Sequence, residues 1–355
     1  MQTIDRSASP TWAEIQQQPD TWLTTLALMA KHPATSSIRA LRGDSILCGA
    51  GSSAYAANAV EAAWPGARAI PTTDVLTEGG RLPPARMMLS LARSGNSPES
   101  LAAIDRVRHS QPSLRHFAIT CNAEGRLAQQ PGVSAIVLDP RTNDRGLAMT
   151  SSFSNLVLAG LCVSHADEIG AELPALCRRV TQRAGELSEH AEHLARTLPA
   201  RVVVLAPPPL FACAREAALK ILELTAGKIA VLAETFLGLR HGPMSFLDAD
   251  TLVLALVSSD RQTRRYEEDV LAELRAKKLG KLMGILPDGC DASIVDEAIP
   301  AVAGGLPDYL RTPFETMYAQ LLAFHLSVRA GLDPDHPSPA GVITRVVQGF
   351  TIYPQ

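Results

Sequence analysis

The chain has 355 residues, and this length suits two domains of about 150 residues better than one hydrophobic core. Hydrophobic residues make up 46% and charged residues 19%, and the net charge of −3 argues against nucleic acid or an anionic membrane surface as a partner. Neither a signal-peptide pattern nor an apolar run of about 18 residues is found, and six scattered cysteines without a CxxC pair indicate reduced thiols, so we expect a cytoplasmic protein.

Short apolar runs alternate with helical patterns in the first half of the chain. The N-terminal stretch 12–30 reads as helical and is expected to pack on one domain. Strands are predicted at 45–51, 67–74, 86–92, 115–120 and 134–139. Helices are predicted at 53–64, after Pro98 and from about 150 to 165, and 172–197 reads as a helical connector.

The same alternation then starts again. Strands are predicted at 200–207, 228–234, 251–259 and 281–287, and helices at 210–227, 264–278 and 312–331. Continuous apolar strands between helices are typical of parallel sheets that are covered on both faces. The fold class is therefore α/β, with two tandem three-layer α/β/α sandwiches.

Two strand-to-helix turns in the first half combine glycine with hydroxyl groups. "GAGSS" (49–53) follows the first strand and "RSGNSPES" (93–100) follows the third. Ligands gather at the carboxyl ends of parallel strands, where free N–H groups and the positive end of a helix favour phosphate. The alternative is capping alone, with Ser97 as the N-cap before Pro98. Two such turns at neighbouring strand ends favour phosphate, and the lack of GxGxxG or GxxxxGK[ST] argues against a nucleotide.

The helix at 210–227 carries ionisable residues on one face. Glu216, Lys220 and Glu223 stand at i, i+4 and i+7. One interpretation is a solvated stripe with pairing between neighbours. The apolar flanks favour a second, in which a partly buried acid on this face has a raised pKa and transfers protons.

Two irregular segments contain further candidates. Gly238, Gly242 and Pro243 make a helix implausible around His241, so this histidine is either a loop acid/base or a cap on a backbone carbonyl. The segment 331–350 lacks helical periodicity, and Arg345 within it is a candidate contact for a ligand.

These stretches together resemble the tandem sugar isomerase (SIS) domain proteins over nearly the whole chain. "CGAGSSA" and "LARSGNSPES" resemble phosphosugar-binding turns, and "AREAALKILELTAG" and "LRHGP" resemble the catalytic helix and histidine loop of the isomerase half of glucosamine-6-phosphate synthase. With "PTTD", "NDRGLAMTSS" and "DPDHPSPAGVITRVVQG", the pattern is more similar to the tagatose-6-phosphate ketose/aldose isomerase group, described as galactosamine-6-phosphate deaminase/isomerases.

The resemblance implies roles for individual residues. It assigns the sugar phosphate to five residues of the two turns: Ser52, Ser53, Arg93, Ser94 and Ser97. It assigns four catalytic residues: proton transfer between C1 and C2 to Glu223, ring opening to His241, and support to Lys220 and Glu216. It implies an N-terminal helical segment (1–40), a first SIS domain with the phosphosugar-binding turns (41–170), a helical connector (171–199), a second SIS domain with the catalytic helix (200–335) and a C-terminal tail (336–355).

The sequence departs from the synthase in three places. The synthase tail has a lysine that forms a Schiff base, whereas residues 337–347 contain no lysine and Arg345 supplies charge only. Ala92 stands where the synthase has a phosphate-binding serine. Met1 is followed by Gln2 with no cysteine nucleophile, so glutamine is not expected to be the ammonia source.

The resemblance predicts an enzyme that converts galactosamine 6-phosphate to tagatose 6-phosphate and ammonia, as a homodimer and without a metal or redox cofactor. The alternatives are a glucosamine-6-phosphate deaminase, a plain ketose/aldose phosphate isomerase and a non-catalytic sugar-phosphate sensor. Galactosamine 6-phosphate and glucosamine 6-phosphate are C4 epimers that differ in the orientation of one hydroxyl group, so the sequence does not decide between these two substrates.

Overall fold

The computed structural model describes residues 6–78, 81–338, 340–347, 349 and 351–353. The chain divides into two compact units. Gln16–Cys177 and Ala340–Gln355 form the β1–β5 unit, and Met1–Ile15 and Arg178–Pro339 form the β6–β10 unit. The domain boundaries drawn from the sequence stay a prediction, and the expectation about Met1 and Gln2 lies outside the described residues.

Two parallel sheets carry the fold in the described part of the chain. The strands of the first sheet are β1 (Ser45–Cys48), β2 (Arg68–Ala69), β3 (Met87–Ala92), β4 (Arg115–Thr120) and β5 (Val133–Val137). Those of the second are β6 (Arg201–Ala206), β7 (Ala230–Thr235), β8 (Leu252–Leu256), β9 (Lys281–Leu286) and β10 (Glu297–Pro300). The first runs β2-β1-β3-β4-β5 and the second β10-β9-β8-β6-β7, which is the same connectivity read in the opposite direction. The predicted pair of α/β sandwiches is confirmed.

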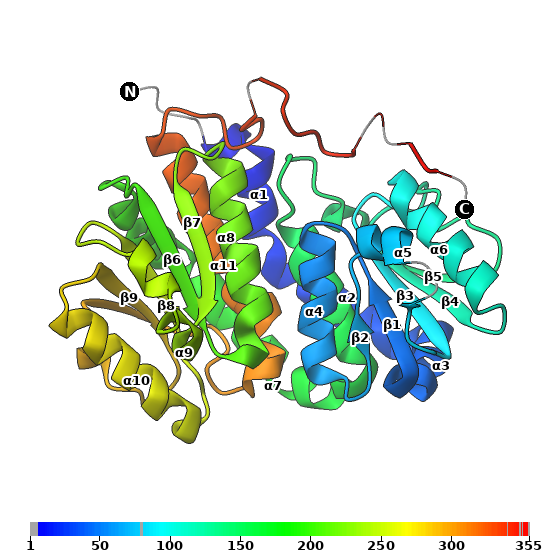
Figure 1. Cartoon of the computed structure of the whole chain (residues 1–355), viewed down its shortest axis with the longest axis horizontal. Coiled ribbons are helices and arrows are strands. Elements are labelled where there is room, and N and C mark those ends of the chain that lie inside the picture. Colours follow the sequence, from blue (N-terminus) through cyan, green and yellow to red (C-terminus); the bar gives the residue numbers. More distant parts are fainter. Residues whose placement is uncertain (1–5, 79–80, 339, 348, 350, 354–355) are drawn as a thin grey trace. The chain divides into compact units, whose positions relative to one another are not determined.

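Helices cover both faces of the first sheet (Figure 1). They are α2 (Gln18–Lys31), α3 (Pro33–Leu41), α4 (Ser52–Ala63), α5 (Thr72–Glu78), α6 (Pro98–Ser110) and the first part of α7 (Ser151–Ala195). On one face, Ile46 and Met88 of the strands pack with Ile104 and Val107 of α6. This apolar layer fixes the direction in which β1 and β3 end.

The second strand is shorter than the sequence pattern predicts. Only Arg68 and Ala69 pair with β1, and a helix begins at Thr72. Pro71 stands directly before this helix, and its fixed φ suits the entry to a helix.

The long helix α7 joins two helices that the sequence predicts separately. His165 leaves helical geometry, with φ −124° and ψ 27°, and Pro174 stands inside the helix. A proline removes one backbone hydrogen bond and is a common cause of helix bending. The two predicted helices are therefore real, and the chain passes between them without a loop.

The second sheet lies between α8 (Phe211–Leu224) and α11 (Asp308–Arg329) on one face and α10 (Arg261–Ala276) on the other (Figure 1). Val203 and Val253 of the strands pack with Val270 and Leu274 of α10. A short helix α9 (Phe236–Leu239) follows β7, and α8 ends before Gly227, whose φ of 72° fits the predicted helix stop. Strand β10 was not predicted.

The N-terminal helices contribute to both units, so the expectation that they pack on one sandwich is wrong. In the β6–β10 unit, the backbone N–H of Thr11 in α1 (Pro10–Gln16) donates to Asp335. In the β1–β5 unit, Trp22 Nε1 of α2 donates to Ser154 Oγ. The chain divides at Gln16, and Pro19 in the first turn of α2 starts a new helix there.

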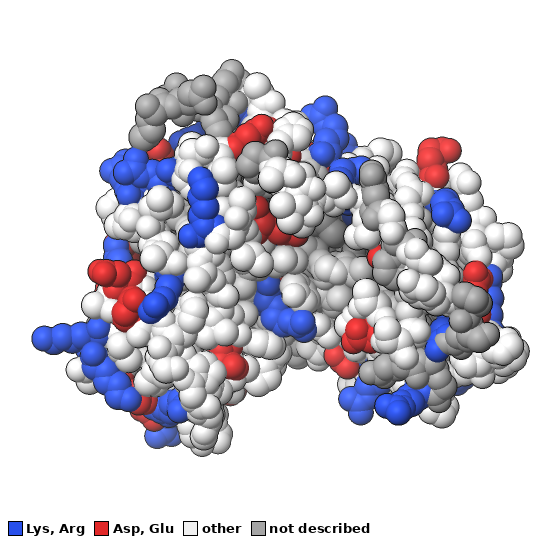
Figure 2. All heavy atoms as spheres, turned by 45° about the horizontal axis from the view of Figure 1, so that its top comes forward, with Lys and Arg blue, Asp and Glu red and all other residues white. Residues whose placement is uncertain are grey.

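Charge of both signs is distributed over the molecular face that Figure 2 shows. Among the described residues, no helix combines the length and apolar character needed to cross a membrane. Five of the six cysteine thiols are buried, and Cys290 is half-buried.

Candidate active site

The charged face of α8 folds into a compact cluster. Lys220 Nζ donates to Glu223 Oε2 at 2.5 Å and lies 3.4 Å from Glu216 Oε1. Glu216 and Lys220 are buried, whereas the Glu223 side chain is 22% exposed. The interpretation as a solvated stripe is therefore wrong for the first two residues. Ala217 and Ile221 lie between them in the sequence and are also buried, so the helix carries its charges into the interior.

The cluster holds one cation against two carboxylates. Charges leave water at a high cost unless they are paired, and Lys220 offsets part of this cost for its neighbours. Of the three side chains, only Glu223 reaches solvent to a substantial degree. The arrangement can therefore present one carboxylate to a substrate, with a fixed ammonium group beside it that stabilises negative charge.

His241 lies in a short loop between two single helical turns. Thr235 caps α9 by accepting from the backbone N–H of Gly238, and a 3-10 turn follows at Pro243–Phe246. The expectation that no helix forms near residue 238 is corrected, because one turn is capped there. The His241 side chain is exposed, and no hydrogen bond or ion pair joins it to the α8 cluster among the described residues. Arg240 ties the loop to Glu273 of α10 at 2.6 Å.

The turn after β1 depends on two glycines. A Cβ at Gly49 would lie 2.3 Å from the backbone of Ser53, so only glycine fits there. Gly51 adopts a φ of 57° just before α4. Ser52 and Ser53 are buried in the first turn of the helix, and Ser53 Oγ approaches Met149 Sδ at 3.9 Å. This contact is weak, so the hydroxyl of Ser53 retains its capacity to bind an anion.

The turn after β3 ends beside the turn after β1, because Cys48 of β1 pairs with Ser90 of the parallel strand β3. Ser94 Oγ accepts from the backbone N–H of Asn96 at 3.3 Å and keeps its own proton for a ligand. Ser97 is the N-cap residue of α6, as predicted, but its hydroxyl donates to the Glu99 carboxylate and does not cap the helix. Phosphate binding through Ser97 therefore requires this bond to break.

Arg93 is not an exposed charge at the surface of the turn. It is buried, and its guanidinium donates to the carbonyls of Gly146, Leu147 and Arg345. Its first observable role is to hold the turn, the segment before α7 and the C-terminal tail together.

Arg345 fastens the tail from the other side. Its Nε donates to the carbonyl of Asp144 at 2.9 Å and its Nη2 donates to Asn143 Oδ1 at 2.7 Å. Its role as a ligand contact stays a prediction.

Two buried groups, one in each unit, had no role assigned from the sequence. Asp144 is fully buried and accepts from the backbone N–H groups of Thr150 and Ser152, at 2.7 and 2.9 Å, which caps α7. An aspartate shortly before a run of hydroxyl residues at a helix start is a signal that could have identified it. Arg311 of α11 is buried between Asp308 and Glu315, and nothing in the helical pattern distinguishes it from a surface arginine.

No group of three or more His, Cys, Asp or Glu side chains with the arrangement of a metal site occurs among the described residues.

Comparisons with known proteins give matches over the full length. The D-galactosamine-6-phosphate deaminase AgaS of Escherichia coli O157:H7 is 36% identical over 98% of this chain and 97% of its own length. The structure of tagatose-6-phosphate ketose/aldose isomerase from Escherichia coli is 30% identical and matches with a TM-score of 0.83, covering all of this chain and 99% of that one. A structure from Clostridium novyi NT matches with a TM-score of 0.90 at 30% identity, covering 99% of this chain and 96% of its own. No protein-family model matches the sequence.

Proposed function

The chain belongs to the family of the D-galactosamine-6-phosphate deaminase AgaS, whose members are tandem SIS-domain proteins, and from this premise we propose that it deaminates an amino-sugar 6-phosphate. The preferred substrate is galactosamine 6-phosphate and the products are tagatose 6-phosphate and ammonia. The observation that carries the proposal is the identity of 36% over 98% of the chain to a relative of that name.

The α8 cluster supports the proposal chemically. Deamination of an aldose amine needs a carboxylate that moves a proton between C2 and C1. Glu223 is the partly exposed carboxylate of the cluster, and Lys220 keeps it paired. We assign the proton transfer to Glu223 and the support of its charge to Lys220 and Glu216.

The proposed reaction needs no electron acceptor. The sugar ring opens to the aldehyde, a step assigned to His241. Removal of the C2 proton gives an enolamine, and protonation at C1 gives an imine at C2. Water adds to the imine carbon and the C–N bond breaks, which releases ammonia and leaves the ketone. Galactosamine 6-phosphate and water are thereby converted to tagatose 6-phosphate and ammonia, with every atom accounted for.

The serine turns are assigned to the phosphate. Ser53 and Ser94 have hydroxyl groups that remain able to bind it, and both follow strands whose carboxyl ends are adjacent. Ser52, Ser97 and Arg93 are assigned to the same anion. The cytoplasmic location and the homodimer expected from the sequence belong to the same proposal.

An assay of ammonia release tests the function. Purified protein is incubated with the 6-phosphates of galactosamine, glucosamine and N-acetylgalactosamine, and ammonia and ketose phosphate are measured together. We expect both products from galactosamine 6-phosphate. Faster release from the gluco epimer would assign that substrate, ketose formation without ammonia would assign a plain isomerase, and turnover of none would refute an enzyme.

The role of Glu223 is tested by Glu223→Gln. We expect turnover to fall by about 10²- to 10⁴-fold, the range for loss of a general acid/base. Binding of the phosphosugar, measured by calorimetry, should persist. Glu268→Gln on α10 is the matched control, because that residue is a half-buried glutamate outside the cluster. Unchanged turnover in the Glu223 variant would remove the assigned role.

A further inference from the structure

The β6–β10 unit has a cavity at the place where its fold favours a ligand. In a parallel sheet with this strand order, ligands bind at the carboxyl ends of the strands. The site lies at the switch point, between the first and the third strand of the sheet, where the direction in which strands are added reverses. In the β1–β5 unit this point lies between β1 and β3, where the serine turns stand. Its counterpart in the β6–β10 unit lies between β6 and β8.

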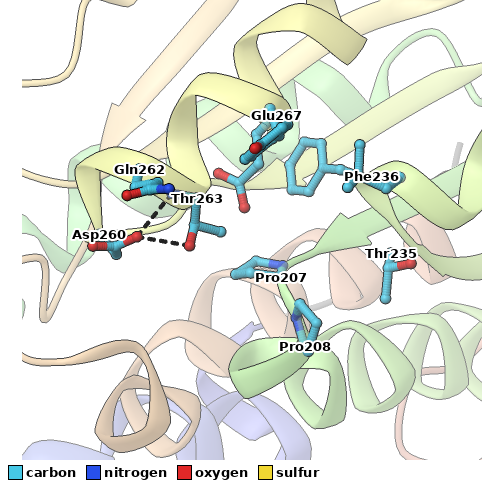
Figure 3. Close-up of a pocket in the computed structure, with 10 residues that line it drawn as sticks. Pro207, Pro208, Thr235, Phe236, Asp260, Gln262, Thr263 and Glu267 are labelled. Atoms are coloured by element: carbon cyan, nitrogen blue, oxygen red, sulfur yellow. Dashed lines mark hydrogen bonds between the residues drawn. The ribbon is translucent and has the colours of Figure 1, made fainter.

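The cavity at this second point has a volume of about 490 Å³. Pro207 follows β6, Thr235 ends β7, Phe236 begins α9, and Asp260 and Glu267 belong to the start of α10 and its second turn. Figure 3 shows these side chains around one open space, with the Glu267 carboxylate directed into it from α10. All of them belong to one unit, so the cavity is a property of that unit alone.

Glu267 lines this cavity and has one carboxyl oxygen without a hydrogen-bond partner among the described residues. The residue is 2% exposed, and its Oε2 accepts from the backbone N–H of Ser258 at 2.8 Å. Its Oε1 is buried and has no hydrogen-bond partner among the described residues. Burial raises the pKa of Glu267 to about 8. A buried carboxyl oxygen without a partner is costly, and a ligand that donates to it would remove that cost.

The chemistry of the lining disfavours an anion. Asp260 is the N-cap of α10, and its Oδ2 accepts from the backbone N–H of Thr263 at 2.8 Å and from its hydroxyl at 2.7 Å. A carboxylate thus already occupies the helix end that would otherwise attract phosphate. No lysine or arginine lines the cavity in the described part of the chain.

The remaining lining is apolar and aromatic. Phe236, Tyr266 and the two prolines 207 and 208 offer flat surfaces, and Gln262 and Thr263 offer hydrogen bonds. Apolar faces with a few convergent polar groups are typical of small-molecule sites, and the volume suits a molecule of monosaccharide size.

We propose that this cavity is a second ligand site, which binds an unphosphorylated, hydroxylated primary amine of hexosamine size. Its ammonium group donates to Glu267 Oε1, and its hydroxyl groups contact Gln262 and Thr263. The ammonium group favours the ionised form of Glu267, so the buried charge forms only together with its partner. The aromatic face of Tyr266 covers the ring of the ligand.

Calorimetry with D-galactosamine as the probe tests this site. The wild-type protein is compared with Glu267→Gln, and with Asp269→Asn as a control that removes an exposed acid from the same helix. We expect D-galactosamine to bind the wild type and the control equally and Glu267→Gln at least 10-fold more weakly. Uncharged D-galactose should bind the wild type at least 10-fold more weakly than the amine. Equal binding to Glu267→Gln, equal binding of galactose, or no binding to the wild type would overturn the proposal.

Three further variants test the aromatic contact and separate this site from the proposed catalytic site. Tyr266→Ala is expected to weaken D-galactosamine binding without loss of fold, because Tyr266 is 52% exposed. Ser94→Ala and Glu223→Gln should bind D-galactosamine as the wild type does. Loss of binding in the last two would place the amine at the proposed catalytic site and refute a second site, whatever the enzyme's activity proves to be.

Discussion

Ser94 is a turn residue whose hydroxyl group can still donate a hydrogen bond to a ligand. Its oxygen accepts from Asn96, and its proton is left for another partner. If that partner is the substrate phosphate, Ser94→Ala should raise KM about 10- to 100-fold, because a hydrogen bond to a charged group contributes roughly 1.5–3 kcal/mol. The value of kcat should change little, since the bond is present in ground and transition states alike.

Steady-state kinetics with galactosamine 6-phosphate separates the two parameters. Ser110→Ala is the control, because this exposed serine ends the helix that Ser97 begins. A fall in kcat with unchanged KM in the Ser94 variant would exclude a phosphate contact and indicate a role in the chemical step.

His116 on β4 is buried, and both of its ring nitrogens lack a hydrogen-bond partner among the described residues. Burial, helped by the positive charge of Arg108, lowers the pKa of His116 to about 4. As the pH falls below about 6.5, the unfolded chain binds a proton that the folded chain does not. The free energy of unfolding should therefore decrease between pH 6.5 and pH 4, by about 1–3 kcal/mol from this group.

His116→Leu removes this contribution. Urea unfolding followed by circular dichroism at pH 4.5, 5.5 and 6.5 should show a weaker pH dependence in the variant than in the wild type. An identical pH dependence in the two proteins would mean that folding does not lower the pKa of His116.

Spacing along a helix identified the α8 cluster, but only the folded chain shows which of its members is accessible. Glu216, Lys220 and Glu223 share a face by their i, i+4, i+7 positions. The burial of the first two depends on the packing of α8 against the sheet and α11, which no local pattern encodes. Glu267 was missed for the same reason, since its helix reads as an ordinary charged surface helix.

Helices and strands were predictable from the sequence where the apolar run or the helical pattern extended over many residues. Strand β10 escaped because its residues are mostly exposed or half-buried and end in Pro300, so its hydrophobic pattern is weak. The helix at Thr72 escaped because the run before it continues the strand pattern up to Pro71. The position of the His241 loop depends on contacts such as Arg240 with Glu273, which join residues distant in sequence.

At the carboxyl end of β8, a buried ionic network holds the chain to α11. Arg311 Nη1 donates to the carbonyl of Val257 at 2.9 Å and to Asp308 Oδ1 at 2.8 Å, and its Nε donates to Glu315 Oε1 at 3.3 Å. Arg311→Met would leave two buried carboxylates without their cation. We expect a loss of about 3–5 kcal/mol in the free energy of unfolding.

Urea unfolding measures this loss, with Arg265→Met as the control because Arg265 is an exposed arginine of α10. A loss under 1 kcal/mol in the Arg311 variant would show that the carboxyl groups are protonated or that water replaces the cation.

Across the whole chain, the same strand order places two different sets of side chains at corresponding positions. Both sheets follow the same strand order, but the first has serine turns at its switch point and the second has an acid-lined cavity. The repeat of strand and helix patterns was visible in the sequence. The difference between the two switch points was visible only in part, because "APPPLF" differs from "GAGSSA" while the acids of the cavity come from a helix about 55 residues later.

If the protein is a homodimer, as proposed, mixed dimers can show whether His241 acts within its own chain or on the partner chain. Its side chain is exposed and makes no bond to the α8 cluster among the described residues, as expected of a group that serves a partner chain.

We mix the inactive variants Glu223→Gln and His241→Ala, unfold them together and refold them. If His241 acts on the partner's Glu223, each mixed dimer regains one intact site. Half of the dimers are mixed, so about a quarter of the wild-type ammonia release should return. If both residues act within one chain, every site keeps one lesion and no activity returns. The separately refolded variants, measured at the same total concentration, give the baseline against which any recovery is judged.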